Sequence, residues 1–316
     1  MTRHPATRPS TTPAREVLAR FGVDIEKAHR SGTSASNEVW LAERIVLRLS
    51  RGPGSSLRRE AALASILPAD VGYPEVLGHG VDDGREWEVT TRLPGRNLEE
   101  AWPDLDADRR ADAVTDLWRR VRAIHRADVE RARALGCTST PFYALAEADA
   151  ARLLGGLTEQ GLVDEVLGRR LREMLAEMFH AVRLVPLALA HTDAGPGNCV
   201  WTGSHAVPID FEFACVAPAD LDLENVLRCL AFQSGPDPTG RLVQEAAELL
   251  SRPGARTRLW GYAVLRDLWG LRLWLHNAQT SNDIERWGGD PEDFRTWGPW
   301  LHLRGHANRT SWLADL

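Results

Sequence analysis

The 316-residue sequence has a single lysine, Lys27, only four cysteines and no long apolar run. The longest apolar stretch, Leu184–Ala190, is far shorter than the roughly 20 residues that a membrane helix requires. The cysteines are Cys137, Cys199, Cys215 and Cys229. They form no CxxC pair, which disfavours a zinc ribbon or a disulfide scaffold. Because the N-terminal residues also lack the apolar core of a signal peptide, we expect reduced thiols, a cytoplasmic location and no membrane partner.

The charge balance is moderately acidic, with 38 basic against 44 acidic side chains and a net charge of −6. A general nucleic-acid-binding protein would carry a basic face, so we expect no nucleic-acid partner. Since every basic residue except Lys27 is an arginine, a phosphate contact through a basic side chain must use arginine or Lys27. These quantities predict no particular oligomeric state.

The sequence changes character at Leu93-Pro94-Gly95, where we place a domain boundary. Residues 1–14 are predicted to be a disordered tail, residues 15–93 a small β-rich lobe, and residues 94–316 a larger and mainly helical lobe. Short helices are expected over 16–21 and 57–67. The expected strands of an antiparallel sheet are Glu38–Leu41, Arg44–Leu49, Val76–Gly80 and Trp87–Thr91. The predicted fold class is therefore α+β.

Helical spacing dominates the second lobe. Asp106 is the predicted N-cap of a helix that runs to about Ala127, and a second helix is predicted over Leu162–Val182. Three short β segments are expected next, over 187–190, 199–201 and 207–211. From Asp222 onward the chain is predicted to be helical again and is rich in tryptophan.

Polar residues between these β segments have the types that phosphoryl transfer requires. His191, Asp193 and Asn198 are predicted to lie on a loop between two strands, and Asp210 at the end of the next strand. The reaction needs a carboxylate that orients the attacking hydroxyl, together with oxygen ligands for Mg²⁺. Asp193 is suited to the first role, and Asn198 with Asp210 to the second.

The spacing H-x-D-x-x-x-x-N, followed by Asp210-Phe-Glu212, resembles the aminoglycoside phosphotransferase and choline kinase superfamily, which are small-molecule relatives of protein kinases. The first lobe adds further motifs in the family's order, namely the Ser31–Asn37 loop, Arg48, Glu60 and the hinge at 90–95. The resemblance covers roughly residues 25–230. It implies a bilobal protein-kinase-like fold that uses ATP and Mg²⁺.

The resemblance also implies roles for individual residues. In the second lobe, Asp193 would be the catalytic carboxylate, and Asn198 and Asp210 would bind Mg²⁺. In the first lobe, the implied nucleotide-binding residues are Arg48 and its partner Glu60, the loop hydroxyls Ser34 and Ser36, and the hinge residues Thr91 and Leu93, whose backbone would bind adenine.

Three positions depart from the usual family pattern. Thr192 replaces a glycine that would allow more backbone freedom, and Ala194 replaces a larger apolar residue. Arg48 stands where many relatives have lysine; it can clamp phosphate oxygens but needs more room.

The resulting functional prediction is an ATP-dependent kinase that transfers the γ-phosphate to a hydroxyl of a small molecule. The preferred acceptor is an aminoglycoside-type or other amine-bearing antibiotic or metabolite. This acceptor class predicts a role in antibiotic resistance. The alternatives are a nucleotide-binding pseudokinase without transfer activity and a kinase of an amino alcohol or a sugar. A protein kinase is disfavoured because no Ala-Pro-Glu anchor follows Asp210.

Several residues remain open at this stage. His191 is interpreted as a structural residue that holds the loop, and either Asp220 or Asp222 as the anchor of that loop. Glu212 fits a second metal ligand and a solvated acid equally well. The C-terminal tryptophans are expected mainly to pack the core, although some of them, with acids such as Asp267, could line a pocket for a cationic acceptor.

Overall fold

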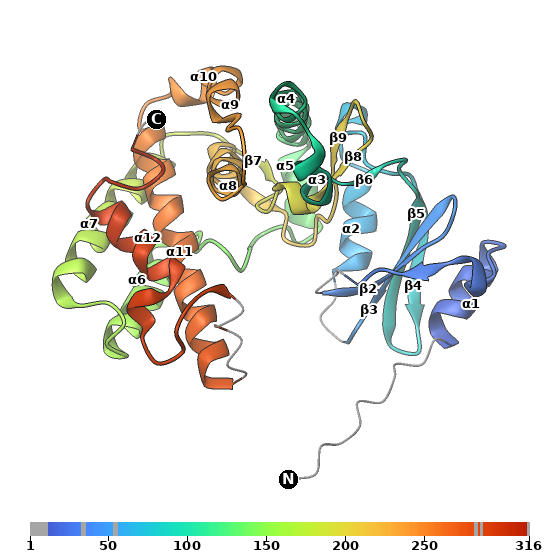
Figure 1. The fold of residues 1–316 in the computed structure, drawn as a ribbon, viewed down its shortest axis with the longest axis horizontal. Coiled ribbons are helices and arrows are strands. Elements are labelled where there is room, and N and C mark those ends of the chain that lie inside the picture. Colours follow the sequence, from blue (N-terminus) through green and yellow to red (C-terminus); the bar gives the residue numbers. More distant parts are fainter. Residues whose placement is uncertain (1–11, 33–35, 53–55, 281–283, 285–286, 315–316) are drawn as a thin grey trace, which may run out of the picture. The chain divides into compact units, whose positions relative to one another are not determined.

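The computed structural model describes residues 12–32, 36–52, 56–280, 284 and 287–314. The chain divides into two compact units. The first, here called the sheet unit, consists of the chain up to Ile66 and of Tyr73–Pro94, and the second, the helical unit, consists of Leu67–Gly72 and the chain from Gly95. Each unit is described by itself (Figure 1).

The sheet unit is built on a five-stranded antiparallel sheet in the order β1-β2-β3-β5-β4. Its strands are β1 (His29–Arg30), β2 (Asn37–Leu41), β3 (Ile45–Ser50), β4 (Val76–Asp82) and β5 (Arg85–Thr91). The four predicted strands are therefore present, each with ends within a few residues of the expected ones. Asp83 and Gly84, both at positive φ, form the turn between β4 and β5.

The two helices of the sheet unit cover different faces of this sheet. Because side chains alternate along a strand, Leu47 and Leu49 of β3 point to one face and Arg48 to the other. The leucine face packs on α1 (Thr12–Arg20), and α2 (Leu57–Ala64) lies on the Arg48 face. The α1 helix begins at Thr12, so our assignment of residues 12–14 to a disordered tail was wrong. The fully buried Ala14 belongs to the apolar core.

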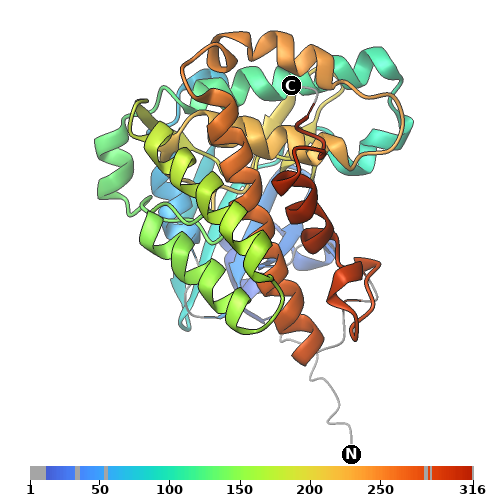
Figure 2. The same ribbon diagram turned by 90° about the vertical axis from the view of Figure 1, so that its left-hand side faces the viewer.

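The helical unit contains the remaining helices (Figure 2). They are α3 (Leu98–Ala101), α4 (Ala107–Ile124), α5 (Val129–Ala134), α6 (Glu147–Glu159), α7 (Glu165–Val182), α8 (Asp220–Ala231), α9 (Thr239–Glu245), α10 (Ala247–Leu250), α11 (Ala255–Thr280) and α12 (Gly298–Ala307). Short 3₁₀ turns lie in this unit at Ala69–Val71, Trp102–Asp104, Pro196–Asn198 and Phe294–Thr296, and in the sheet unit at Ile25–Lys27.

The α11 helix is the central element of the helical unit. It packs against α6, α7, α8 and α12, and Figure 2 shows it between the lime-green pair α6 and α7 and the red α12. Between Arg258 and Leu271 nearly every residue of α11 is buried, whichever side of the helix it lies on, which is why no single apolar stripe marks this part in the sequence. None of the described helices combines the length and apolar character needed to cross a membrane.

Helix caps explain where the two long predicted helices begin. The carboxylates of Asp106 and Asp164 accept the backbone N–H groups of Arg109 and Leu167, so α4 and α7 start directly after them. The second helix therefore starts three residues later than predicted. We did not predict α6, whose sequence includes two adjacent glycines at 155 and 156.

Two small sheets carry the polar loop of the helical unit. One pairs β7 (Leu187–Ala190) with β10 (Cys215–Pro218), and the other has the order β6-β8-β9, formed by Arg96–Asn97, Cys199–Trp201 and Ala206–Pro208. Gly95 precedes β6 at φ +132°, where an added Cβ would lie 2.2 Å from the Trp201 carbonyl oxygen. Only glycine fits this approach.

Candidate active site

The loop after β7 is anchored by the carboxylate of Asp222, near the start of α8. The backbone N–H groups of His191 and Thr192 donate to Asp222 at 2.9 and 2.7 Å, and His125 at the end of α4 lies 2.8 Å from it through Nε2. Asp222 is completely buried. Burial alone would raise the pKa of this carboxyl, but the contacts with His125 and His191 outweigh it and the pKa is lowered. An ionised Asp222 therefore holds the loop.

The other candidate anchor, Asp220, has a different role. Its carboxylate pairs with the fully buried Arg258, with Nε at 2.7 Å, and accepts the Tyr262 hydroxyl at 3.3 Å. Burial raises the pKa of Asp220, and the neighbouring Arg258 only partly offsets it. Asp220 thus ties α8 to α11, and the ambiguity between the two aspartates is resolved in favour of Asp222 as the loop anchor.

Thr192, which stands where relatives have glycine, has a left-handed backbone conformation with φ +67°. This conformation is unfavourable for a β-branched residue and costs on the order of 1–3 kcal/mol. Three contacts hold it: the backbone N–H donates to Asp222, the hydroxyl donates to the Phe213 carbonyl at 2.9 Å, and the same hydroxyl lies 3.2 Å from Thr140 Oγ1. These polar contacts therefore stabilise a backbone conformation that glycine would adopt without strain.

His191 is a structural residue, as its sequence context indicated. Its Nδ1 accepts the backbone N–H of Asp193 at 3.3 Å, and its Nε2 lies 3.0 Å from the Ile209 carbonyl oxygen. Because one ring nitrogen must accept and the other must donate, the ring is the neutral tautomer with hydrogen on Nε2. His191 links the Asp193 loop to the segment that carries Asp210.

The carboxylate of Asp193 is held at both of its oxygens. The amide Nδ2 of Asn198 donates to Oδ2 at 2.9 Å and to the Asp193 carbonyl at 3.0 Å. Arg266 of α11 donates through NH2 to Oδ1 at 3.2 Å. Asp193 remains about one quarter exposed, so a ligand in solution can reach it.

Asn198 and Asp210 are brought together by a hairpin. Strands β8 and β9 pair Cys199 with Pro208, and the Asn198 carbonyl accepts the Ile209 N–H at 2.9 Å. Asp210 follows directly, at φ +66°. The strand that we predicted over 207–211 therefore ends at Pro208, and Asp210 lies in the irregular segment after it rather than on the strand.

Gly195 keeps the loop close to α8. An added Cβ on this residue would lie 2.6 Å from the sulfur of Cys229, which no real contact allows. Burial and the nearby Asp193 raise the pKa of the Cys229 thiol to about 12, so the sulfur is a neutral packing group.

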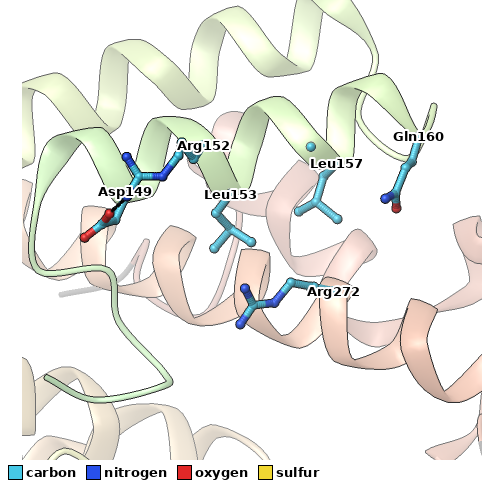
Figure 3. A pocket seen from close by; sticks show the side chains of 7 residues that line it. Asp149, Arg152, Leu153, Leu157, Gln160 and Arg272 are labelled. Carbon is cyan, nitrogen blue, oxygen red and sulfur yellow. Dashed lines mark hydrogen bonds and ion pairs between the residues drawn. The ribbon is translucent and has the colours of Figure 1, made fainter.

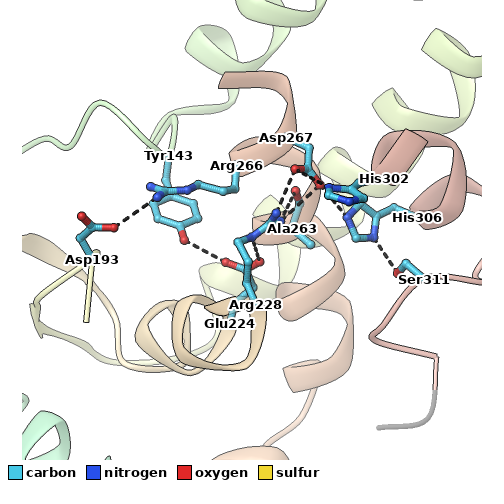
Figure 4. A network of polar contacts seen from close by, with 10 residues as sticks. All are labelled: Tyr143, Asp193, Glu224, Arg228, Ala263, Arg266, Asp267, His302, His306 and Ser311. Carbon is cyan, nitrogen blue, oxygen red and sulfur yellow. Dashed lines mark hydrogen bonds and ion pairs between the residues drawn. The ribbon is translucent and has the colours of Figure 1, made fainter. Parts of the chain in front are cut away.

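A polar network extends from this loop into the interior of the helical unit (Figure 4). Tyr143 donates to Glu224 at 2.8 Å, and Arg228 bridges Glu224 and Asp267, each at 2.9 Å. Asp267 is also contacted by His302 and His306, at 3.4 and 2.9 Å. Burial opposes the ionisation of Asp267, but Arg228 and the two histidines outweigh it and lower its pKa.

These contacts exclude one sequence-based idea. Asp267 is buried and already neutralised by Arg228, so it does not line a pocket for a cationic acceptor. Trp260 and Trp297 are core residues, which agrees with the packing interpretation. Trp269 differs, because its ring faces the guanidinium of Arg266 with 5.0 Å between Arg266 Cζ and the ring centroid.

In the sheet unit, Arg48 lies between two buried carboxylates. Its NH1 is 2.6 Å from Glu60 Oε2 on α2 and 3.4 Å from Glu88 Oε2 on β5. Glu88 stands directly opposite Arg48 in the strand register. Ser56 Oγ donates to Glu60 at 3.2 Å. The expected Arg48–Glu60 pair is thus present, and Glu88 is an acidic neighbour that the sequence analysis missed.

The remaining predicted nucleotide-binding residues lie along the sheet unit. Ser34 falls outside the described residues, and Ser36 is exposed beside β2. At the hinge, the Thr91 N–H donates to the Glu75 carbonyl, and Arg92 bonds to the Arg44 carbonyl. The backbone of Leu93 makes no hydrogen bond with any other described residue, so its N–H and C=O could serve a ligand.

A groove of about 390 Å³ lies between α6 and α11 (Figure 3). Its lining residues are Asp149, Arg152, Leu153, Gly156, Leu157, Gln160 and Arg272. Asp149 and Arg152 form an ion pair along α6. None of the predicted site residues lines this groove.

The residues that we missed share one property: they reach the predicted site residues only through the tertiary fold. Arg266 lies 73 positions after Asp193, and no motif marks it. Glu88 could have been inferred from the alternation of β5, had the pairing with β3 been known.

A family model described as "Phosphotransferase enzyme family" matches residues 27–290. No curated protein sequence matches the chain. Among solved structures, aminoglycoside 2'-phosphotransferase-IIIa in its GDP complex superposes with a TM-score of 0.70 at 16% identity, over 96% of this chain and 100% of that chain.

Two further solved structures are similar. A choline/ethanolamine kinase family protein from Mesorhizobium loti has a TM-score of 0.62 at 19% identity, covering 97% of this chain and 95% of that chain. A macrolide 2'-phosphotransferase from Brachybacterium faecium has a TM-score of 0.59 at 18% identity, covering 87% and 96%. At these identities the likeness concerns the fold, and it confirms the predicted α+β, protein-kinase-like class.

Proposed function

Because the chain belongs to the phosphotransferase enzyme family and is a phosphotransferase with an alcohol group as acceptor, we propose that it is an ATP-dependent kinase of a small, amine-bearing molecule. The preferred acceptor class is an aminoglycoside-type antibiotic or a related metabolite. The proposal includes a role in antibiotic resistance. It also includes a cytoplasmic location, where ATP is available.

The observation that carries the proposal is the arrangement of Asp193, Asn198 and Asp210 in the helical unit. Asn198 holds Oδ2 of Asp193 through its amide nitrogen. Its amide oxygen is therefore directed to another ligand, and Asp210 follows on the neighbouring backbone. An amide oxygen beside a carboxylate is a donor set that suits Mg²⁺. We assign these two residues to Mg²⁺, which when bound supplies positive charge to the phosphate oxygens.

Asp193 is the residue that we assign to the acceptor. Its carboxylate is fixed at both oxygens and partly exposed, so it can accept a hydrogen bond from an incoming hydroxyl without reorganising. As the new O–P bond forms and the bond from the γ-phosphorus to the leaving ADP oxygen breaks, the hydroxyl proton passes to Asp193. Because the transition state is loose, positioning and charge neutralisation supply most of the catalysis.

In the sheet unit, we assign Arg48 to the phosphates of the nucleotide. Two buried carboxylates fix its guanidinium, so little side-chain entropy remains to be lost on binding. Ser34 and Ser36 are proposed to add hydroxyl contacts. The backbone of Thr91–Leu93 is proposed to bind adenine, and the proposal is supported by the Leu93 backbone, which makes no hydrogen bond to another residue that the structure describes.

The solved structures guide the choice of acceptors to test. They include an aminoglycoside phosphotransferase bound to GDP and kanamycin, a hygromycin B complex with ADP, a streptomycin complex with ATP and a choline/ethanolamine kinase family protein. Since both adenine and guanine nucleotides occur in these complexes, ATP and GTP should be compared as donors.

The test is ADP or GDP release with kanamycin, hygromycin B, streptomycin, a macrolide, choline, ethanolamine, homoserine and simple sugars. We expect acceptor-dependent release with ATP for an amine-bearing antibiotic. Asp193→Asn should lose most turnover, roughly 10²-fold or more, while binding ATP normally. Asp112→Asn, at an exposed position on α4, is the matched control.

Two other results are informative. Thermal stabilisation by ATP without phosphate transfer to any acceptor would favour the pseudokinase, and transfer only to choline, ethanolamine, homoserine or a sugar would favour the amino-alcohol or sugar kinase. Equal turnover in the wild type and in Asp193→Asn would refute the assignment of Asp193.

A further inference from the structure

Arg266, in the middle of α11, is the second residue that holds the carboxylate of Asp193. Its NH2 group lies 3.2 Å from Asp193 Oδ1 (Figure 4). Asn198 binds the other carboxylate oxygen, Oδ2. Within the described part of the chain, Asp193 is the only hydrogen-bond partner of this guanidinium. The two contacts come from different elements, one from the loop itself and one from α11.

Aromatic rings fix the guanidinium in place. Arg266 Cζ lies 3.8 Å from the centroid of Phe142, 5.0 Å from that of Trp269 and 5.8 Å from that of Tyr143. A cation over the face of a ring is attracted by the ring quadrupole, most strongly where water is excluded. The Arg266 side chain is only 17% exposed. It therefore has little freedom to leave Asp193.

The rings are themselves held. Phe142 packs edge-on against Trp269, with 4.9 Å between centroids, and the Tyr143 hydroxyl donates to the buried Glu224. In this ring cage, defined as Phe142, Tyr143 and Trp269, the first two rings are buried in the helical unit and Trp269 is half-buried. The cage restrains Arg266, and Arg266 in turn restrains the Asp193 carboxylate.

A purely structural role does not explain Arg266 well. Its NH1 atom is buried without a hydrogen-bond partner among the described residues, and burying an unsatisfied polar atom costs free energy. A methionine or leucine would fill the same cage without that cost. The feature that an apolar residue cannot supply is the cation at Oδ1.

We propose that Arg266 is a positioning residue for phosphoryl transfer: held by the ring cage, it fixes the Asp193 carboxylate in the orientation that receives the acceptor hydroxyl. This inference rests on the proposed function, because it assigns Arg266 to the same reaction. It acts through Asp193 and does not require contact with the nucleotide or the acceptor.

The kinetic test compares Arg266→Ala, Arg266→Lys and, as a control, Arg256→Ala, which changes an exposed arginine on the same helix. The acceptor is the compound of the panel above that gives the fastest ADP release. We expect Arg266→Ala to lower kcat about 10- to 100-fold, by analogy with the loss of a residue that orients a metal ligand. Its KM for ATP and for the acceptor should change little, since the lost interaction acts in the transition state. Arg266→Lys should keep part of the rate because it keeps the charge but not the planar fork.

Chemical rescue separates positioning from general damage to the fold. The cavity left in Arg266→Ala is bounded by the ring cage and Asp193, so added guanidinium should occupy it. At about 10 mM, far below denaturing concentrations, guanidinium chloride should restore several-fold of kcat, whereas the same concentration of NaCl should not. A kcat that stays within twofold of the wild type in Arg266→Ala, or a loss that guanidinium does not repair, would overturn the inference.

A binding measurement keeps the inference distinct from the proposed function. Guanidinium should raise the melting temperature of Arg266→Ala relative to NaCl, and should do so much less in the double variant Arg266→Ala/Asp193→Asn. If the wild type phosphorylates none of the compounds but this stabilisation is seen, the proposed function fails while the cation site at Asp193 stands. If neither variant is stabilised, the site itself is refuted.

Discussion

The Asp222 carboxylate accepts the backbone N–H of Thr192 at 2.7 Å and holds that residue at φ +67°. A buried anion on α8 thereby stabilises an unfavourable backbone conformation one residue before Asp193. The anchor and the strained residue lie 30 positions apart in the chain, so the shape of the loop depends on how α8 packs.

The loop should become less stable in acid. The pKa values of Asp222 and Asp267 lie below the ordinary aspartate value, so their stabilisation is complete above about pH 4 and is lost as the pH falls through their folded values. We expect the free energy of unfolding in urea to decrease as the pH falls below about 4, and the decrease to be smaller in Asp222→Asn. An identical decrease in wild type and variant would show that Asp222 does not contribute.

Substitutions of Thr192 should separate strain from hydrogen bonding. Thr192→Val keeps the β-branched strain but loses the hydroxyl contact with the Phe213 carbonyl, whereas Thr192→Gly loses the contact and the strain together. We expect the valine variant to be less stable than the glycine variant by about 1–3 kcal/mol in urea unfolding. A more stable valine variant would contradict the assignment of strain to this residue.

Removing Arg48 should destabilise the sheet unit through charge repulsion. Arg48→Met leaves Glu60 and Glu88 as neighbouring buried carboxylates, each with a side chain 0% exposed. Breaking a buried ion pair in this way costs about 3–5 kcal/mol.

The double variant Arg48→Met/Glu88→Gln should recover part of this stability, because one of the two like charges is gone. Urea unfolding of the single and double variants measures the coupling between Arg48 and Glu88. Both variants lack Arg48, so both should bind ATP more weakly than the wild type. Additive effects of the two substitutions would mean that Glu88 and Arg48 are not coupled.

The packing of Gly195 on Cys229 gives a suppressor test. Gly195→Ala places a Cβ 2.6 Å from the Cys229 sulfur, so we expect it to displace the loop and to lower phosphotransferase activity strongly. Adding Cys229→Ala removes the sulfur and should restore much of the activity, although Cys229→Ala alone should have a small effect. If the double variant is as inactive as Gly195→Ala, a steric clash with the Cys229 sulfur is not what inactivates Gly195→Ala.

Much of the fold could be predicted because its information is local. Alternation of apolar residues marked β2 to β5, and the aspartate cap at 106 marked the start of α4. The prediction failed where local cues were weak: α1 begins earlier than its first strong apolar residue suggests, and α6 contains two glycines.

The same distinction holds for the candidate site. The spacing of Asp193, Asn198 and Asp210 was readable in the sequence because a single loop and hairpin carry all three. The residues that hold them were not readable, since Arg266 and Glu88 reach their partners only through the packing of α11 and the pairing of β5 with β3.

By itself, then, the sequence determined the residue types and the order of the motifs, since these depend on near neighbours along the chain. The tertiary structure decided that Asp222 rather than Asp220 anchors the loop, that Asp267 is neutralised in the interior, and that a caged arginine reaches Asp193. Each of these outcomes depends on which buried charges meet, and that is fixed by helix packing between segments far apart in the chain.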